Sequence, residues 1–367
     1  KSRDTSRAKK LPAEESAEDE SEAVMCPHNW SRSKVDAMSA ILKSLKIRVL
    51  PAPMAGGPTT PDSVIAAEHN GSFGALALGT ASLNAAQEQI EACRGHRFGV
   101  NLFHAQEPLS PANMEAVSAM AQELGVSVPE ADLEFGWTEK LNMALDAGAA
   151  VLWSMFGTFT EEEITCIHAA GAEAWTTVTT PAEAVEAARR GVDALCVQGP
   201  EAGGHRGVWD AEAEPDWRPL EELVFAVHAA LGDAPIPLIA AGGMRSSADV
   251  ERALAWPGVV AVSCGSAFLL ASEAGTSPVN RELLACGGRS VSTRAFSGRY
   301  ARGLETEFTR SNPKLSPLYP YLNSMLKPRR AQKDPAVGYC LVGEEVEKIN
   351  GGSVAEILHH LCPNGHS

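Results

Sequence analysis

A single histidine stands in a glycine-rich loop, Gln198–Gly207 (QGPEAGGHRG), directly after the apolar run Val192–Val197 (VDALCV). Such a run is typical of a buried strand. Glycine lets the backbone approach a ligand closely, and histidine has the ordinary side-chain pKa nearest neutrality. His205 is therefore a candidate general base or substrate-positioning group. A solvated loop is the alternative for this segment taken alone.

Two further glycine loops repeat this arrangement. Ala240–Arg245 (AAGGMR) ends the apolar run Pro237–Ala241, and Ser263–Ser266 (SCGS) follows Val259–Val262. Free backbone N–H groups at such strand ends bind anions well. Three successive junctions of this kind predict a phosphate-binding edge.

The elements that must position these loops follow a repeating pattern. Eight apolar runs rich in strand-forming residues alternate with helical segments, of which Pro181–Arg190 and Ser246–Ala255 are the clearest. The eight runs are Ile47–Ala52, Phe73–Leu78, Phe98–Phe103, Ala150–Met155, Ala174–Val178, Val192–Val197, Pro237–Ala241 and Val259–Val262. This alternation predicts an α/β fold, a (β/α)8 TIM barrel with its site at the carboxyl ends of the strands. A doubly wound sheet is the main competitor, but no GxGxxG motif follows the first run.

Three regions are expected along the chain. Residues 1–32 form a charged tail with too few apolar residues to fold, residues 33–275 form the barrel, and residues 276–367 form a smaller, mostly helical cap over its mouth. Within them, we expect a helix over Val35–Leu45 capped by Ser33, and a final helix over Ser353–Leu361. The long connection at residues 104–149 is expected to hold two helices.

Composition narrows the function classes. The net charge of −15 argues against nucleic acid as a partner. No apolar stretch approaches the roughly 18 residues of a membrane span, and no signal peptide opens the chain. The eight cysteines show no CxxC and no metal-like spacing. We expect a cytoplasmic protein without a metal site or membrane association.

Five segments together resemble the nitronate monooxygenases, formerly called 2-nitropropane dioxygenases, which are FMN-dependent barrels. They are Ala52–Gly57 (APMAGG), Phe98–Phe103 (FGVNLF), Gln198–Gly207 (QGPEAGGHRG), Ile239–Met244 (IAAGGM) and Thr293–Leu304 (TRAFSGRYARGL). The flavin-dependent enoyl-acyl-carrier-protein reductases share the barrel and a similar glycine-histidine loop. The resemblance is thus more specific for the superfamily than for the reaction.

The resemblance implies a role for each matching residue. His205 corresponds to the catalytic histidine, which takes a proton from a nitroalkane or positions the nitronate. Asn101 would hydrogen-bond the flavin or substrate, and Gln198 would contact the pyrimidine edge. The flavin ring would lie along Pro53, Met54, Ala55 and Gly56, and the phosphate among Gly203, Gly204, Gly242, Gly243, Ser263, Gly265 and Ser266. An apolar substrate wall would come from Met54, Trp153 and Tyr300, whereas Phe103 and Phe156 are better explained as core.

Two departures from the family pattern affect the substrate range. Some members carry a lysine on the fifth strand facing the flavin, where this chain offers Thr176 and Thr177. Ser263 begins the last phosphate loop where glutamine or asparagine is common.

The function implied is FMN-dependent oxidation of alkyl nitronates, such as propionate 3-nitronate, by O2 to a carbonyl product and nitrite. Two alternatives stay open: an NAD(P)H-dependent flavin reductase of enoyl thioesters or quinones, and a flavin-binding pathway component without turnover. The partners expected are a small nitronate and O2, and a homodimer stays open.

Overall fold

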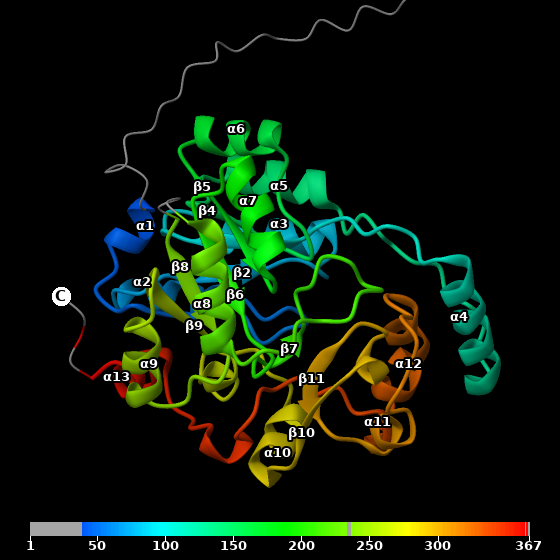
Figure 1. Ribbon diagram of the computed structural model, residues 1–367. Helices are drawn as coiled ribbons and strands as arrows, with labels where there is room; N and C mark the ends of the chain where they lie inside the picture. The colour runs from blue at the N-terminus through cyan, green and yellow to red at the C-terminus, as the bar shows by residue number, and fades with distance from the viewer. Residues whose placement is uncertain (1–38, 233–235, 364, 366–367) are drawn as a thin grey trace, which may run out of the picture. The chain divides into compact units, whose positions relative to one another are not determined.

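Eight parallel strands nearly close into a barrel, with helices between them (Figure 1). The structure is a computed structural model that describes residues 39–232, 236–363 and 365. The strand order is β1-β9-β8-β6-β5-β4-β3-β2. The bounds are β1 (Val49–Pro51), β2 (Ala75–Ala77), β3 (Gly99–Phe103), β4 (Val151–Met155), β5 (Glu173–Val178), β6 (Ala194–Gln198), β8 (Leu238–Ala241) and β9 (Val259–Cys264). The predicted (β/α)8 barrel is confirmed, and each strand overlaps one of the eight predicted runs.

The barrel seam lies between β1 and β2. The Ser72 hydroxyl donates to the carbonyl of Val49 at 2.5 Å, and the backbone N–H groups of Lys46 and Ile47 both donate to the carbonyl of Gly71. These bonds hold the two edge strands together where the ladder pairing is not continuous.

The helices of the barrel begin at strong capping signals. Thr180 and Glu183 form a capping box at the start of α7, Pro181 occupies its first turn, and Gly191 ends it in the left-handed conformation at φ 99°. The predicted helix at 181–190 is therefore confirmed, as are the one over 246–255 and the pair within 104–149. The helices are α1 (Ala40–Lys43), α2 (Pro61–His69), α3 (Leu83–Ala92), α4 (Pro111–Leu124), α5 (Trp137–Asp146), α6 (Glu161–Ala169), α7 (Pro181–Arg190), α8 (Leu220–Leu231) and α9 (Ser247–Leu254).

The amino-terminal end of the barrel is closed by apolar side chains. Leu42 and Leu45 join an interior cluster that includes Phe73, Trp153 and Trp175. Helix α1 starts at Ala40, and the Ser39 hydroxyl accepts from the N–H of Leu42 at 3.0 Å. The predicted start of this helix, its predicted cap at Ser33 and the predicted tail at 1–32 lie outside the described residues.

The region after the last barrel strand holds helices, as predicted, and also a small sheet. Its elements are α10 (Pro278–Cys286), β10 (Ser290–Thr293), β11 (Ala301–Leu304), α11 (Glu307–Ser311), α12 (Tyr321–Ala331) and α13 (Val354–Leu361), with short 3-10 turns η1 (Ser266–Phe268), η2 (Arg294–Phe296), η3 (Pro335–Val337) and η4 (Val346–Lys348). The third strand of that sheet, β7 (Gly204–His205), comes from the glycine-histidine loop and pairs antiparallel with β11. This sheet was not predicted from the sequence.

Two helices link the barrel and the cap: α4 of the barrel packs against the cap, and α13, near the end of the chain, packs against the barrel. In Figure 1, α4 stands out from the barrel beside α12 of the cap, and apolar residues of both share one cluster. Helix α13 returns to the barrel and packs near α2 and α9. In the described part of the chain, every helix is too short or too polar to span a bilayer.

Candidate functional site

A cavity of about 300 Å³ opens at the carboxyl ends of the barrel strands. Residues at or just after the ends of all eight barrel strands line it, and the cap contributes Thr276, Asn280, Asn323 and Tyr339. Among the described residues, its lining contains no carboxylate, and Arg245 is its one permanently charged group. The cavity is thus suited to a ligand that carries negative charge.

Nearly all the residues singled out from the sequence meet around this cavity. Those lining it are Pro53, Met54, Ala55, Gly56, Asn101, Trp153, Gln198, Gly203, Gly204, His205, Gly242, Gly243, Ser263, Gly265 and Ser266. They come from strand ends distant in sequence, so the barrel topology is what brings them together.

Tyr300, predicted as part of the substrate wall, is the exception: it does not line this cavity. Its hydroxyl lies 3.2 Å from both carboxylate oxygens of Glu214, and its ring packs edge-on against Trp217 at 5.1 Å. Tyr300 is absent from the lining of the cavity, and these contacts hold it against Glu214 and Trp217.

One end of the cavity is built as an anion cradle. In the described part of the chain, the backbone N–H groups of Gly242, Gly243 and Ser266 have no hydrogen-bond partner. Gly242 and Gly243 adopt positive φ angles of 131° and 72°. Residues other than glycine rarely adopt this backbone conformation. Ser266 also begins η1, whose amino end faces this cradle.

Two side chains at this end were not singled out from the sequence. The Arg245 guanidinium donates to the carbonyls of Met244 and Glu344, at 2.9 and 2.8 Å, while its buried Nε has no partner. The Thr276 hydroxyl is also buried and unpartnered. Arg245 is the last residue of the predicted loop Ala240–Arg245 and could have been chosen for that reason. Thr276 could not, because only the fold brings it to the cavity.

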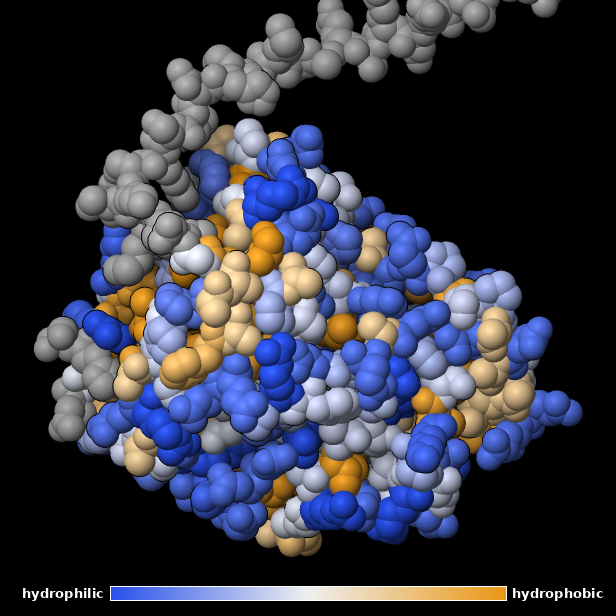
Figure 2. Space-filling model, viewed as in Figure 1, coloured by the Kyte–Doolittle hydropathy of each residue, from blue (hydrophilic) through white to orange (hydrophobic). Residues whose placement is uncertain are grey.

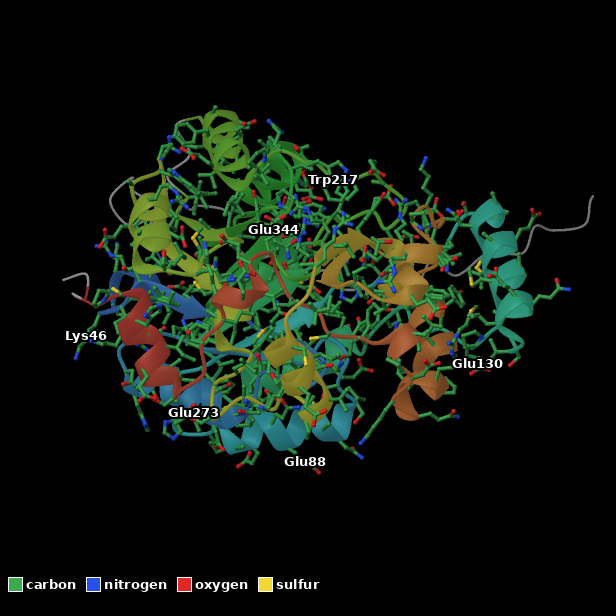
Figure 3. All side chains as sticks on the ribbon, turned by 90° about the horizontal axis from the view of Figure 1, so that it is seen from below. Lys46, Glu88, Glu130, Trp217, Glu273 and Glu344 are labelled. Atoms are coloured by element: carbon green, nitrogen blue, oxygen red, sulfur yellow. The ribbon has the colours of Figure 1, made fainter. Side chains whose placement is uncertain are left out.

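The cap holds the cradle in place. Figure 3 shows Glu344 between the barrel helices and the strands of the cap. Its backbone carbonyl accepts a hydrogen bond from the Arg245 guanidinium. One residue earlier, the N–H of Gly343 donates to the Ser266 hydroxyl at 2.8 Å. The segment after α12 therefore contacts the two loops, after β8 and after β9, that were predicted to bind phosphate.

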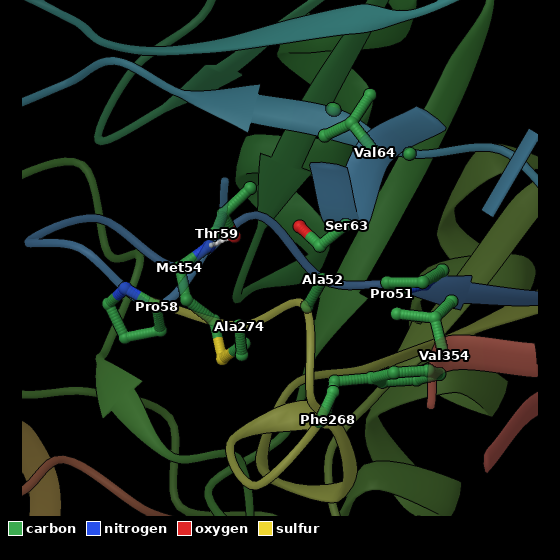
Figure 4. A pocket seen from close by; sticks show the side chains of 13 residues that line it. Pro51, Ala52, Met54, Pro58, Thr59, Ser63, Val64, Phe268, Ala274 and Val354 are labelled. Atoms are coloured by element: carbon green, nitrogen blue, oxygen red, sulfur yellow. Dashed lines mark hydrogen bonds between the residues drawn. The ribbon is translucent and has the colours of Figure 1, made fainter. Parts of the chain in front are cut away.

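The loop after β1 forms another wall of the cavity. The N–H of Met54 donates to the Thr59 hydroxyl at 2.8 Å, which closes the loop on itself (Figure 4). Behind it lies an apolar cavity of only about 10 Å³, lined in part by Val64, Phe268 and Val354. That space is too small for a ligand, so it is a packing gap beneath the loop.

The side-chain amides of Gln198 and Asn101 both line the cavity, but they differ in how many of their hydrogen-bonding atoms are free. Gln198 donates to the carbonyl of His205 at 2.9 Å and accepts from the N–H of Gly207 at 2.8 Å, so it shapes the glycine-histidine loop. Asn101 donates to the carbonyl of Trp153 at 3.0 Å, and its oxygen has no hydrogen bond within the described residues.

On β5, the two threonines face opposite sides. Thr177 lines the cavity and accepts from the Trp153 indole N–H at 3.0 Å. Thr176 is bonded instead to the hydroxyls of Ser154 and Thr158 outside the barrel interior. In the described chain, no lysine lines the cavity where some family members carry one.

His205 is held between the barrel and the cap. Its Nε2 lies 2.8 Å from the Ser297 hydroxyl, and its ring packs edge-on against Phe156 and Tyr319 at 5.9 and 5.6 Å. Removal from bulk water, reinforced by the positive charges of Arg299 and Arg330, lowers the pKa of His205 to about 3. The imidazole is therefore neutral across the physiological pH range.

The neighbouring Arg299 is fully buried, and within the described residues it forms no ion pair with a carboxylate. It donates to the carbonyl of Val208 and to the Gln106 side chain, and lies 4.1 Å from the centre of the Phe156 ring. Its Nε has no partner in the described chain. Burial lowers the pKa of Arg299 to about 10, so the guanidinium still carries its charge at neutral pH.

Three cysteines also line the cavity: Cys196, Cys264 and Cys340. Burial raises the pKa of each of these thiols to about 12. They remain protonated at neutral pH and are poor nucleophiles.

Comparison with known proteins agrees with this geometry. The profile of the nitronate monooxygenase family matches residues 38–364. The chain belongs to that family. A nitronate monooxygenase of Pseudomonas aeruginosa is 31% identical over 298 residues, covering 76% of this chain and 84% of the relative. A probable nitronate monooxygenase of Bacillus subtilis is 30% identical, covering 87% and 96%.

Solved structures support the same fold. A nitroalkane oxidase from Streptomyces ansochromogenes superposes with a TM-score of 0.80 at 28% identity, covering 89% of this chain and 97% of that one. FabK from Thermotoga maritima superposes with a TM-score of 0.66 at 23% identity, covering 88% and 93%. Family membership makes this protein an oxidoreductase of the monooxygenase class and supports oxidation of nitronates as its general reaction.

Proposed function

We propose that this protein is an FMN-dependent nitronate monooxygenase that oxidises alkyl nitronates with O2 to a carbonyl compound and nitrite. The observation that carries the proposal is one cavity that combines an anion cradle at one end with a neutral histidine at its wall. The chemistry that FMN supplies when bound is electron transfer between the nitronate and O2.

The unpartnered polar groups of the cavity fit a flavin monophosphate. The free N–H groups of Gly242, Gly243 and Ser266 and the Nε of Arg245 would bind its phosphate, with Thr276 as a further donor. The loop at 53–56 would lie along the ring, and the free oxygen of Asn101 would accept from the ring or the substrate. The chain's own contribution is to bind, orient and exclude water.

His205 is better suited to positioning an anion than to abstracting a proton. A base whose pKa lies near 3 accepts a proton weakly at neutral pH. A neutral imidazole can donate a hydrogen bond, and when the Ser297 hydroxyl donates to Nε2 the proton resides on Nδ1. We therefore propose that the substrate arrives as a preformed nitronate, of which propionate 3-nitronate is an example.

The test begins with the flavin. Flavin released from the purified protein should migrate as FMN on chromatography, and an anaerobic sample should bleach when propionate 3-nitronate is added. Bleaching by NADPH and not by the nitronate would instead assign the reductase function. Absence of any flavin after reconstitution would contradict both.

Arg245 provides a check on the phosphate assignment. Arg245→Met removes a charged hydrogen-bond donor, which is worth about 1.5–3 kcal/mol, so FMN should bind about 10–150-fold more weakly. Arg245→Lys should restore part of the affinity. Arg252→Met, which removes an exposed arginine on the neighbouring α9, is the matched control and should leave FMN binding unchanged. Unchanged affinity in Arg245→Met would place the phosphate elsewhere.

A further inference from the structure

Two histidines and a glutamate converge on the opposite side of the barrel from the cavity. Glu68 and His69 are the last two residues of α2, which leads to β2. His96 lies between α3 and β3. Both connections enter their strands at the amino-terminal ends, whereas the cavity lies at the carboxyl ends. The cluster is therefore separate from the proposed active site.

The side chains are already close enough to share a ligand. Glu68 Oε2 lies 3.0 Å from His96 Nδ1, and the two imidazole rings are 5.2 Å apart in an edge-to-face arrangement. One ligand atom from each of the three side chains can be chosen so that all lie within 4.8 Å of one another. Among the described residues, this is the one group of His, Cys, Asp or Glu side chains that meets this condition.

These spacings can be compared with those of a bound metal ion. Zinc–nitrogen bonds of about 2.0–2.1 Å place neighbouring tetrahedral ligands about 3.3 Å apart. The pair formed by Glu68 and His96 already has nearly this spacing. The His69 side chain is exposed and makes no hydrogen bond in the described part of the chain, so it can rotate inward.

Glu68 and His96 are both accessible to an ion from solvent. Their side chains are 24% and 32% exposed, respectively. His96 can therefore turn from the carboxylate to a metal while both side chains stay at the same site.

We propose that Glu68, His69 and His96 bind a zinc ion, with water completing the coordination. Nitrogen and carboxylate oxygen are ligands that zinc accepts in this combination. The ion would join the end of α2 to the turn before β3. Because the amino-terminal face of a TM barrel serves stability and not catalysis, the site stabilises the fold without taking part in turnover.

The test uses the full-length protein loaded with its cofactor and stripped of metals with EDTA. Zinc chloride titrated by isothermal calorimetry should bind at one equivalent and raise the melting temperature. In His96→Ala and in His69→Ala, the affinity should fall by more than about 10-fold, since losing even a side chain that merely supports a metal ligand costs that much. His69 is exposed, so its removal should leave the metal-free protein folded.

The matched control is His359→Ala combined with His360→Ala, which removes an exposed histidine pair from α13. It should bind zinc as the unaltered protein does. Equal zinc affinity in His69→Ala, His96→Ala and the unaltered protein would overturn the proposal, as would failure of the unaltered protein to bind zinc. A loss of nitronate turnover when zinc occupies the site would contradict its separation from catalysis.

Discussion

At the scale of single residues, charge and protonation decide what the cavity can do. Arg299 and Arg330 place positive charge near His205, and among the described residues no carboxylate lines the cavity. This arrangement favours an anionic ligand and disfavours an imidazolium. From the sequence, His205 could act as a general base or position the substrate, and its environment supports the positioning role.

Replacement of His205 separates these two roles. His205→Asn should retain FMN and lower kcat/KM for a preformed nitronate by about 10–150-fold, because a hydrogen bond to a charged group is worth about 1.5–3 kcal/mol. Rates with the nitronate and with its neutral nitroalkane should be measured on one preparation. If the nitronate rate is unchanged while the nitroalkane rate falls by ~10²–10⁴-fold, His205 is a general base after all.

The low pKa of His205 also makes stability depend on pH. The folded value is about 3 and the ordinary value is 6.5, so between these pH values the unfolded chain takes up a proton that the folded chain refuses. Stability contributed by this group is full above pH 6.5 and is lost as the pH falls toward 3. His205→Gln should therefore lose less stability than the unaltered protein between pH 6.5 and 4, as measured by urea unfolding. Parallel losses in the two proteins would show that His205 titrates normally.

At the scale of elements, the sequence was sufficient for the barrel and insufficient for the cap. Each barrel strand is an apolar run bounded by turn residues, which is a local signal. Strand β7 has two residues, and Gly204 and His205 have no local preference for extended structure; they form a strand because β11 lies beside them. The orientation of Tyr300 was missed for the same reason, since it depends on the register of that sheet.

The candidate site also combines residues that could be predicted from the sequence, at the ends of barrel strands, with cap residues that could not. Residues at the ends of barrel strands could be placed from the repeat and the resemblance, and they do line the cavity. Thr276, Asn280 and Asn323 could not, because they reach it from the cap across long sequence separations. Arg245 was within the quoted loop, but only the structure shows that its guanidinium is buried with an unsatisfied Nε.

Close packing of Gly203 against the cap gives a test of how the loop is held. A Cβ on Gly203 would lie 2.4 Å from the backbone nitrogen of Gly343 and 2.6 Å from the carbonyl carbon of Val342. Gly203→Ala should therefore displace the loop, lowering FMN content and turnover while the far-ultraviolet circular dichroism of the barrel is retained.

Gly338→Ala is the control for that variant. A Cβ there meets its nearest atoms at 3.6 Å, so it should leave FMN content and turnover unchanged. Full activity in Gly203→Ala would show that the contact between the loop and the cap is dispensable.

At the scale of the whole molecule, the surface is mostly hydrophilic and the floor of the barrel is closed by apolar side chains. Hydrophilic residues cover most of the face seen in Figure 2, in keeping with the net charge of −15. Exposed apolar side chains do occur, for example Val185 on α7 and Phe225 on α8. The barrel floor is sealed by Leu42 and Leu45, both within the described residues.

Because Leu42 and Leu45 already close the barrel floor, residues 1–22 are not needed to cover it. Removal of residues 1–22 should leave FMN content, turnover and melting temperature unchanged, because that segment has almost no apolar residues to contribute to a core. Flavin content and thermal unfolding of the shortened protein test this. Precipitation or loss of flavin would show that the segment contributes to the fold.

The pairing of β7 with β11 ties the histidine to the cap. His205 lies opposite Ala301, and its ring contacts Tyr319 and Ser297, all of which belong to the segment after the barrel. The free N–H groups of the anion cradle, in contrast, belong to loops after β8 and β9. Substitutions in the cap beside His205 should therefore shift the imidazole more than they shift the N–H groups of Gly242, Gly243 and Ser266.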